Sequence, residues 1–196
     1  MPKTTPRCQH EPCRGPMPVT ARADARYCSG RCRTAACRAR KTIPTELTSR
    51  PRWIRRTARK VPLTVHGDVA SSTDPATWSR HAYAAASTAG VGLGFVLDGD
   101  GVVCLDLDHA LDDGELLPWA QAIVDAAGPT WVEVSASGTG LHIWGRGSLP
   151  HGRRIPIGSG SVELYGIGRY IAVTGRTFGG TPRRLGDLQH VIDELL

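Results

Sequence analysis

The sequence has no apolar run near the roughly 18–20 residues that a membrane-spanning helix needs, so no membrane partner is expected. Its first residues, MPKTTPRCQHEPC, lack the apolar stretch of a secretory signal. We therefore expect a cytoplasmic protein. Internal repeats and low-complexity segments are also missing, and the length of 196 residues suits one domain of ordinary size with a small appendage.

Acidic residues are scarce in the first part of the chain. Residues 1–60 hold 16 of the 24 Lys and Arg residues but only 3 of the 18 Asp and Glu residues, so this part carries a formal charge of +13 and the rest carries −7. A basic segment beside an acidic body indicates a polyanionic partner, and nucleic acid is the first candidate. A solvated, disordered tail is the simpler alternative, but the cysteines in this segment argue against it.

Five of the six cysteines fall between residues 8 and 37, in a C-x4-C pair followed by a C-x3-C pair and one more cysteine. In a cytoplasmic chain this pattern indicates a metal site before it indicates disulfides. Four thiolates would close a tetrahedral Zn²⁺ site, although a redox-active or adventitious cluster would have the same spacing. The predicted ligands are Cys8, Cys13, Cys28 and Cys32, with His10 and Cys37 as substitutes. The stretch YCSGRCRTAACRAR also resembles the second half of treble-clef-like zinc knuckles, where a basic helix follows.

The segment after the cysteines has little periodicity. Residues 42–59 are rich in Pro and Arg and indicate a linker between a zinc-binding basic module at 1–41 and a body at 60–196. Within the body, a single helix is expected to begin at Pro75 and to end at Gly90.

Period-two patterns after this helix predict strands in antiparallel pairs. VGLGFVL and GVVCLDLD are joined by Asp-Gly-Asp-Gly at 98–101, TWVEVSAS and LHIWGRG are joined by GTG, and SVELYG and RYIAVTGR follow one another. LLPWAQAIVDAAG and RLGDLQHVIDELL have helical periodicity. The predicted fold class is therefore α+β, with antiparallel-strand-rich sheets and helices packed on one face.

The stretch CLDLDHA places two acids on one face of a predicted strand. Its apolar residues would point to one side, and Asp106 and Asp108 to the other. Carboxylates this close disfavour mutual ionisation unless a cation lies between them, and their hard oxygens suit Mg²⁺ or Mn²⁺. SVELYG repeats the pattern at Glu163, and three carboxylates on neighbouring strands could hold two metals. Solvent-facing acids on a one-sided sheet would give the same pattern.

A Gly-rich turn, SASGTG, lies directly before a strand histidine. Gly138 and Gly140 let the backbone approach a ligand and expose N–H groups to phosphate oxygens, with Ser137 beside them. A histidine in a strand is more often a structural residue than a catalyst, so it is the turn that favours a phosphate contact for His142. Trp144, two residues on, would stack on a base or pack in the core.

Three stretches of the sequence resemble the successive motifs of the archaeo-eukaryotic primase superfamily. In chain order they are VCLDLDH, VEVSASGTGLHIWG and VELYGIGRYIAVTG. Within it the resemblance is to the bifunctional DNA primase/polymerase (prim-pol) domain of phages, plasmids and integrated actinobacterial elements. It covers about residues 58–196, which makes 60–196 the expected catalytic domain with a primase–polymerase core.

The resemblance implies an activity and its site. The activity would be template-dependent joining of nucleoside triphosphates on single-stranded DNA with two Mg²⁺ or Mn²⁺ ions. The implied metal ligands are Asp106, Asp108 and Glu163, and the implied nucleotide contacts are His142, Lys60 and Arg169. The sequence has no G-x-x-x-x-G-K-[ST] loop, so a separate helicase is expected as a partner. The alternatives are a non-catalytic, zinc-dependent DNA-binding replication protein and a two-metal nuclease.

Overall fold

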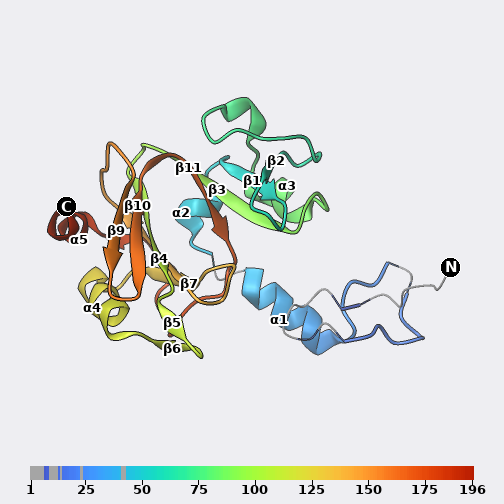
Figure 1. Ribbon diagram of the computed structural model, residues 1–196. Helices are drawn as coiled ribbons and strands as arrows, with labels where there is room; N and C mark the ends of the chain where they lie inside the picture. The colour runs from blue at the N-terminus through green and yellow to red at the C-terminus, as the bar shows by residue number, and fades with distance from the viewer. Residues whose placement is uncertain (1–6, 9–12, 14, 23, 41–42) are drawn as a thin grey trace. The chain divides into compact units, whose positions relative to one another are not determined.

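A computed structural model describes residues 7, 8, 13, 15–22, 24–40 and 43–196, with the backbone alone at 36–40. The chain divides into two compact units, which we call the first unit (Met1–Thr42) and the second unit (Ile43–Leu196). Figure 1 shows the course of the chain through both, and each is described by itself. Across the described ranges, none of the helices has the length and apolar character that crossing a membrane requires.

The first unit consists of a cysteine-bearing loop region and the helix α1 (Gly30–Arg40). The hydroxyl of Ser29 accepts the backbone N–H of Cys32 at 3.2 Å, as an N-capping serine does, so the helix start places Cys32 in its first turn. Further up the chain, the backbone N–H of Cys8 donates to the carbonyl of Gly15 at 2.9 Å. The basic helix expected after the second cysteine pair is therefore present.

The second unit contains two large sheets. The first sheet has the strand order β11-β3-β1-β2, with every pair antiparallel. Its strands are β1 (Trp53–Arg56), β2 (Pro62–Leu63), β3 (Gly92–Asp98) and β11 (Ile167–Val173). Three short helices belong to the same stretch of chain, namely α2 (Thr45–Thr48), the 3-10 helix η1 (Pro75–Thr77) and α3 (His81–Ala86).

The second sheet has the order β12-β8-β4-β10-β9, and β7 also pairs with β8. Its strands are β4 (Val102–Asp108), β7 (Trp131–Val134), β8 (Leu141–Arg146), β9 (Arg153–Ile157), β10 (Gly160–Tyr165) and β12 (Gly186–Asp187). The β12–β8 pair is parallel and the others are antiparallel, so the predicted pairing of TWVEVSAS with LHIWGRG is confirmed. A small hairpin, β5 (Leu111–Asp112) and β6 (Glu115–Leu116), follows β4.

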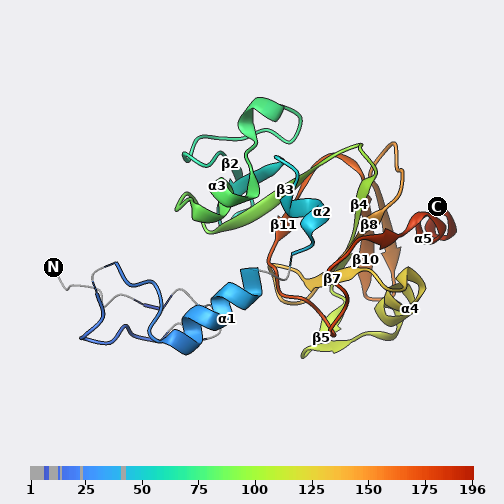
Figure 2. The same ribbon diagram turned by 180° about the vertical axis from the view of Figure 1, so that it is seen from behind.

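The helices α4 (Pro118–Ala127) and α5 (Gln189–Leu195) cover one face of the second sheet (Figures 1 and 2). Leu105 and Leu107 of β4 are fully buried in this layer, in one core cluster with Ile123 of α4 and Ile192 of α5. Burying an aliphatic side chain of this size contributes about 1.5–3 kcal/mol, so this face is held firmly. The predicted α+β class, with antiparallel sheets and helices on one face, is confirmed.

Aromatic side chains fill the contact between the two sheets. The ring of Trp144 on β8 lies 5.9 Å from the ring of Phe95 on β3 and 6.1 Å from that of Trp131 on β7. Trp53 on β1 packs against Phe95 at 5.2 Å. Trp144 is fully buried, so of its two predicted roles the packed one is correct.

The predicted linker at 42–59 is wrong for the described residues from 43 onward. This segment forms α2 and β1, and Leu47, Trp53 and Ile54 are fully buried. The indole N–H of Trp53 donates to the carbonyl of Leu47 at 3.1 Å. The sequence did not indicate a strand because the few apolar residues of this segment lie among Arg and Pro. Three buried apolar side chains are enough to pack the segment against the sheet.

The single helix expected from Pro75 to Gly90 is also wrong, because the chain forms η1 and α3 instead. Asp74 caps η1, since its carboxylate accepts the N–H of Ala76 at 3.0 Å. The helix stops because Trp78 adopts an extended backbone and its indole donates to the carbonyl of Ser71 at 2.7 Å.

Two predicted strand pairs do not form. β3 and β4 belong to different sheets, and so do β10 and β11. The turn between β3 and β4 is held by other segments instead: Arg50 and Arg52 contact the carboxylate of Asp100 at 3.0 and 2.7 Å. The N–H of Gly99 donates to the carbonyl of Gly166, between β10 and β11, at 2.9 Å. The chain therefore passes between the sheets at both connections, and the two connections touch.

We expect Asp100→Asn to lower the free energy of unfolding by about 1–3 kcal/mol at neutral pH, because Arg52 is buried and would lose its charged partner. Burial alone would raise the pKa of Asp100, but the hydrogen bonds and charges of Arg50 and Arg52 outweigh it and lower that pKa below 3.8. The contribution of Asp100 is thus present above this pH and is lost as pH falls through the lowered pKa.

Urea unfolding at pH 7 and pH 3 measures this effect. The difference between the wild type and Asp100→Asn should be smaller at pH 3. Asp98→Asn is the matched control, because Asp98 is exposed at the end of β3, two residues before Asp100. Equal stability of the wild type and Asp100→Asn at pH 7 would contradict the assignment.

Candidate active site

Strand register lines up five functional side chains across the second sheet. Glu133 on β7 lies opposite His142 on β8, and His142 lies opposite Asp106 on β4. Asp106 in turn lies opposite Glu163 on β10, and Glu163 opposite Arg154 on β9. Directly opposed residues of paired strands point to the same face. We call this line of five the cross-sheet row.

The row lies on the face turned away from α4 and α5. In β4 the side chains alternate, so burial of Leu105 and Leu107 beneath the helices puts Asp106 and Asp108 on the other face. Asp106 keeps 18 % of its side chain exposed and Glu163 keeps 17 %. Asp108 lies opposite Ser161 rather than in the row itself. The alternation predicted for CLDLDHA is therefore present.

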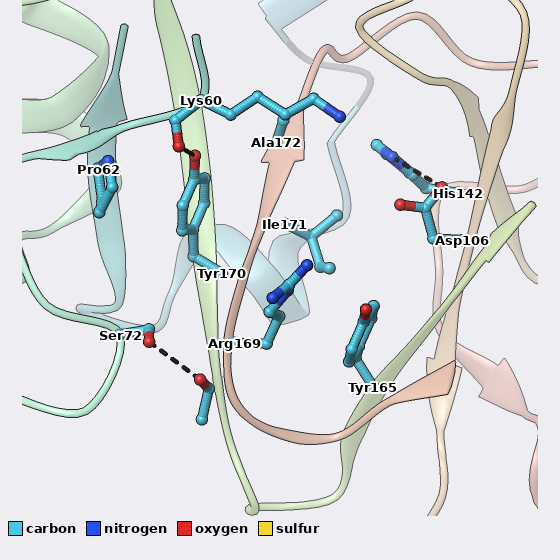
Figure 3. A pocket seen from close by; sticks show the side chains of 11 residues that line it. Lys60, Pro62, Ser72, Asp106, His142, Tyr165, Arg169, Tyr170, Ile171 and Ala172 are labelled. Carbon is cyan, nitrogen blue, oxygen red and sulfur yellow. Dashed lines mark hydrogen bonds and ion pairs between the residues drawn. The ribbon is translucent and has the colours of Figure 1, made fainter. Parts of the chain in front are cut away.

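A cavity of about 330 Å³ lies beside the row, between the two sheets. Asp106 and His142 line it from the second sheet, while Lys60 and Arg169 line it from the β1–β2 turn and from β11 (Figure 3). Tyr165 on β10 and Tyr170 on β11 also line the cavity. The structure thus brings together four of the residues predicted for nucleotide or metal binding. Asp108 and Glu163 are on the adjoining sheet surface and do not line the cavity.

Lys60 is held in an unusual backbone conformation, with φ at +60°, which non-glycine residues rarely adopt. Its carbonyl accepts a hydrogen bond from the hydroxyl of Tyr170 on β11. Figure 3 shows the side chain extending from this turn toward His142. The backbone contact therefore fixes the base of a long cationic side chain that reaches across the cavity.

Arg169 approaches from β11 and is supported by an aromatic ring. Its guanidinium lies over the ring of Tyr165 at 4.9 Å. The hydroxyl of Tyr165 donates to Glu163 Oε2 at 2.5 Å, and Arg154 Nε lies 3.3 Å from Glu163 Oε1. Burial, together with this bond and the charge of Glu163, raises the pKa of Tyr165 to about 12, so the phenol stays protonated and continues to donate.

His142 is buried between two carboxylates. Its Nδ1 lies 3.1 Å from Glu133 Oε1, and its Nε2 lies 3.6 Å from Asp106 Oδ1. Burial alone would lower the pKa of His142, but the hydrogen bond to Glu133 and the charges of Glu133 and Asp106 outweigh it and raise the pKa. A histidine with a raised pKa beside a cavity is suited to binding an anion.

Asp106 is partly buried and lies close to two other carboxylates. Burial raises its pKa most, and the charges of Asp108 and Glu163 add to the rise, while His142 and Lys60 oppose it. A divalent cation on this face would stabilise the ionised form. The three carboxylates share a face but are not gathered closely enough to form a metal site as they stand. Within the described part of the chain, one group of three or more candidate ligands is that close, and it is the cysteine cluster.

That cluster consists of Cys8, Cys13, Cys28 and Cys32, whose sulfur atoms all lie within 4.8 Å of one another. Cys28 Sγ is 3.6 Å from Cys13 Sγ and 3.5 Å from Cys32 Sγ. Two sulfurs bound to one Zn²⁺ at 2.3 Å in tetrahedral geometry would be roughly 3.8 Å apart, so the spacing fits. Contacts with Cys32, Cys13 and Cys8 raise the pKa of the Cys28 thiol to about 12. His10 and the side chain of Cys37 lie outside the described residues.

The Gly-rich turn was predicted to contact the nucleotide. Its residues Ser137, Gly138 and Gly140 do not line this cavity. A Cβ on Gly140 would lie 2.6 Å from the carbonyl oxygen of Leu107, so glycine is needed there to let β8 approach β4. The hydroxyl of Ser137 contacts Ser135 at 3.0 Å and Thr139 at 3.1 Å, which closes the turn on itself.

Glu133 is the residue that the sequence reasoning missed. It is fully buried, and its carboxylate contacts both His142 and Trp144. The available signal was an acid between Val132 and Val134 in a strand that is otherwise apolar, the same pattern that singled out Glu163.

A cavity with three basic side chains and a carboxylate face beside it suits a polyanion held together with divalent cations, as in enzymes that act on nucleotides. The comparisons agree with this class. The chain belongs to the family described as "Bifunctional DNA primase/polymerase, N-terminal", which matches residues 17–194. The resemblance seen in the sequence is confirmed by this match.

A relative with an established description is the "DNA Primase-polymerase" of Nitratiruptor phage NrS-1. It is 37 % identical over 139 residues, an alignment that covers 65 % of this chain and 19 % of the phage protein. The chain therefore spans about a fifth of the length of the relative that it matches.

We expect Gly140→Ala to lower the free energy of unfolding by roughly 1–3 kcal/mol, because the added methyl group meets a backbone carbonyl that has no room to move. Ser137→Ala, an exposed change in the same turn, should alter stability by less than about 0.5 kcal/mol. Chemical denaturation of both variants measures the difference. A Gly140→Ala protein as stable as the wild type would show that the strands are not in such close contact.

Proposed function

We propose that the chain is a template-dependent nucleotidyltransferase, a DNA primase/polymerase that joins nucleotides on single-stranded DNA. The observation that carries this proposal is the position of Asp106, which lies between His142 and Glu163 in the cross-sheet row and lines a cavity with Lys60 and Arg169. Membership of the family and the description of the phage relative support the same reaction.

Asp106, Asp108 and Glu163 would hold a pair of Mg²⁺ or Mn²⁺ ions, and the chemistry of their oxygen donors supports this. Carboxylate oxygens are the ligands these ions prefer, and the neighbouring negative charges that raise the pKa of Asp106 would be neutralised by a cation. When bound, such ions lower the pKa of the attacking 3′-hydroxyl and neutralise the leaving pyrophosphate.

Lys60, His142 and Arg169 would bind the triphosphate. All three line one cavity, and cationic donors form the strongest hydrogen bonds to phosphate oxygens. Lys60 and Arg169 are held by different tyrosines: Tyr170 donates to the backbone of Lys60, and the ring of Tyr165 lies against Arg169. The site therefore orients the nucleotide with groups whose positions are set before it binds, as positioning catalysis requires.

The template would be bound in part by the first unit. Its helix α1 exposes Arg31 and Arg33, and the chain up to residue 60 carries most of the basic residues. Binding of this kind weakens steeply as salt rises. A separate helicase would supply single-stranded DNA, and we place the reaction in the cytoplasm of a cell that carries a phage or another mobile element.

The first unit would also bind one Zn²⁺ through Cys8, Cys13, Cys28 and Cys32, and we propose that it is a zinc-binding module. The spacing of the four sulfur atoms supports this ligand set. A closed four-thiolate site contributes folding free energy to a small unit, which agrees with the few buried apolar side chains among the described residues of this unit.

For the reaction, we expect extension of a primed single-stranded template in the presence of Mn²⁺ and deoxynucleoside triphosphates. Asp106→Asn should reduce the rate by roughly 100-fold or more, because a ligand of the reacting site loses its charge. Asp125→Asn, an exposed change on α4, is the matched control and should leave the rate unchanged. The measurement is labelled-nucleotide incorporation resolved by product length.

Two other outcomes would replace this proposal. No lengthened product from the wild type, with template binding retained, would replace the proposal with a non-catalytic DNA-binding role. Shortening of the template that Asp106→Asn abolishes would replace it with a nuclease.

For the zinc module, metal analysis of the purified chain should give about one Zn²⁺ per chain. Cys28→Ser should lose it, because three thiolates no longer close the site. Cys104→Ala is the control, since Cys104 is a buried cysteine of β4, and this variant should keep the zinc. A wild-type protein that is folded over residues 8–40 and contains no zinc would refute the assignment.

A further inference from the structure

Glu133 is a fully buried acid at the end of the cross-sheet row. Both of its carboxylate oxygens are used. Oε1 lies 3.1 Å from His142 Nδ1 and accepts the indole N–H of Trp144 at 3.3 Å. Oε2 accepts the backbone N–H groups of Thr174 at 2.9 Å and of Gly175 at 2.7 Å. A buried carboxylate costs free energy unless its oxygens are bonded in this way.

These contacts decide how the ring of His142 is oriented. A carboxylate oxygen only accepts hydrogen bonds, so the hydrogen between Glu133 and His142 belongs to Nδ1 of the histidine. The opposite ring nitrogen, Nε2, then lies on the side of Asp106, at 3.6 Å from its Oδ1. This is the side on which His142 lines the cavity (Figure 3). Glu133 thus holds the proton on Nδ1 and decides which ring nitrogen faces a ligand.

Glu133 is itself held from a second direction. Thr174 and Gly175 directly follow β11, the strand that carries Arg169. The hydroxyl of Thr174 also lies 2.9 Å from Glu133 Oε2 and donates to the carbonyl of Val134 at 2.7 Å. The carboxylate is therefore fixed against the end of one cavity wall while it holds the histidine of the other.

We propose that Glu133 is a positioning residue for nucleotide binding, which acts by holding His142 with Nε2 toward the triphosphate. The inference rests on the proposed function for the identity of the ligand. Mutating the carboxylate that orients a metal-ligating histidine typically costs about 10–100-fold in metal affinity or activity. By analogy, we expect a loss of about tenfold in nucleotide affinity when Glu133 is changed to its amide.

Glu133→Gln keeps the size and shape of the side chain but has one oxygen for two sets of donors. Its NH₂ group, a donor, must face either the N–H groups of His142 and Trp144 or the two backbone N–H groups. In both cases donors face donors and hydrogen bonds are lost. The ring of His142 should then turn or change tautomer. Two readouts follow that do not require DNA synthesis: the dissociation constant for dATP, measured by calorimetry without template, and the nitrogen-15 NMR signals of the His142 ring.

The decisive comparison is a double-mutant cycle. If Glu133 acts through His142, adding Glu133→Gln to His142→Ala should weaken dATP binding by less than twofold beyond His142→Ala alone. In kinetics, Glu133→Gln should raise KM for the nucleotide more than it lowers kcat. Val132→Ala is the control for general loosening of β7, because Val132 faces the helix-covered core, and it should lower stability without changing the dissociation constant.

The outcomes are distinct. Unchanged His142 ring signals and unchanged dATP affinity in a folded Glu133→Gln protein would overturn the inference, and so would equal losses in the presence and absence of His142. If Glu133→Gln does not fold, Thr174→Val, which removes one contact to Glu133 Oε2, should shift the His142 signals in the same direction, and unshifted signals would again overturn it. A wild type that binds dATP but makes no product would contradict the proposed reaction and leave the role of Glu133 in binding standing.

Discussion

The position of the site depends on the register of β4 between β8 and β10. Leu105 and Leu107 are buried beneath α4 and α5, and their alternation with Asp106 and Asp108 leaves β4 a single stable register. A slip by one residue would put the leucines in the cavity wall and the carboxylates in the apolar core. The burial of two leucines, a hydrophobic interaction without any chemistry of its own, thereby places Asp106 opposite both His142 and Glu163.

The same register explains the distribution of charge. Asp106, Asp108 and Glu163 lie on the surface of the second sheet, whereas the bases Lys60 and Arg169 come from the β1–β2 turn and β11, outside that sheet. The chain achieves this by crossing between the sheets at 98–101 and at Gly166, where the two connections touch. The consecutive strands β10 and β11 therefore line the cavity from different sheets instead of pairing, and Lys60 and Arg169 face the sheet that carries Asp106.

Much of the fold could be predicted from local patterns, and the two strand pairs that do not form have one cause. Alternation identified β3, β4, β8, β10 and β11, and the GTG turn correctly indicated the β7–β8 pair. The turn at 98–101 and Gly166 indicated reversals, but a local turn does not specify which sheet receives the next strand. That choice depends on Arg50 and Arg52, which bind Asp100 from about fifty residues away. In the site, alternation indicated Asp106, and the resemblance to a family assigned roles to His142, Lys60 and Arg169. Glu133 left only the weak signal of an acid between two valines, and its role follows from its contacts with His142, Thr174 and Gly175.

The central claim is that the acidic face of β4 and the basic wall opposite it form one site for metal ions and a nucleotide. A crystal structure of the chain with Mn²⁺ and a non-hydrolysable deoxynucleoside triphosphate, with anomalous scattering recorded for manganese, tests it most directly. The account predicts manganese at Asp106 with Asp108 or Glu163, and the triphosphate against Lys60, His142 and Arg169. Manganese away from these carboxylates, or a triphosphate bound outside this cavity, would contradict it.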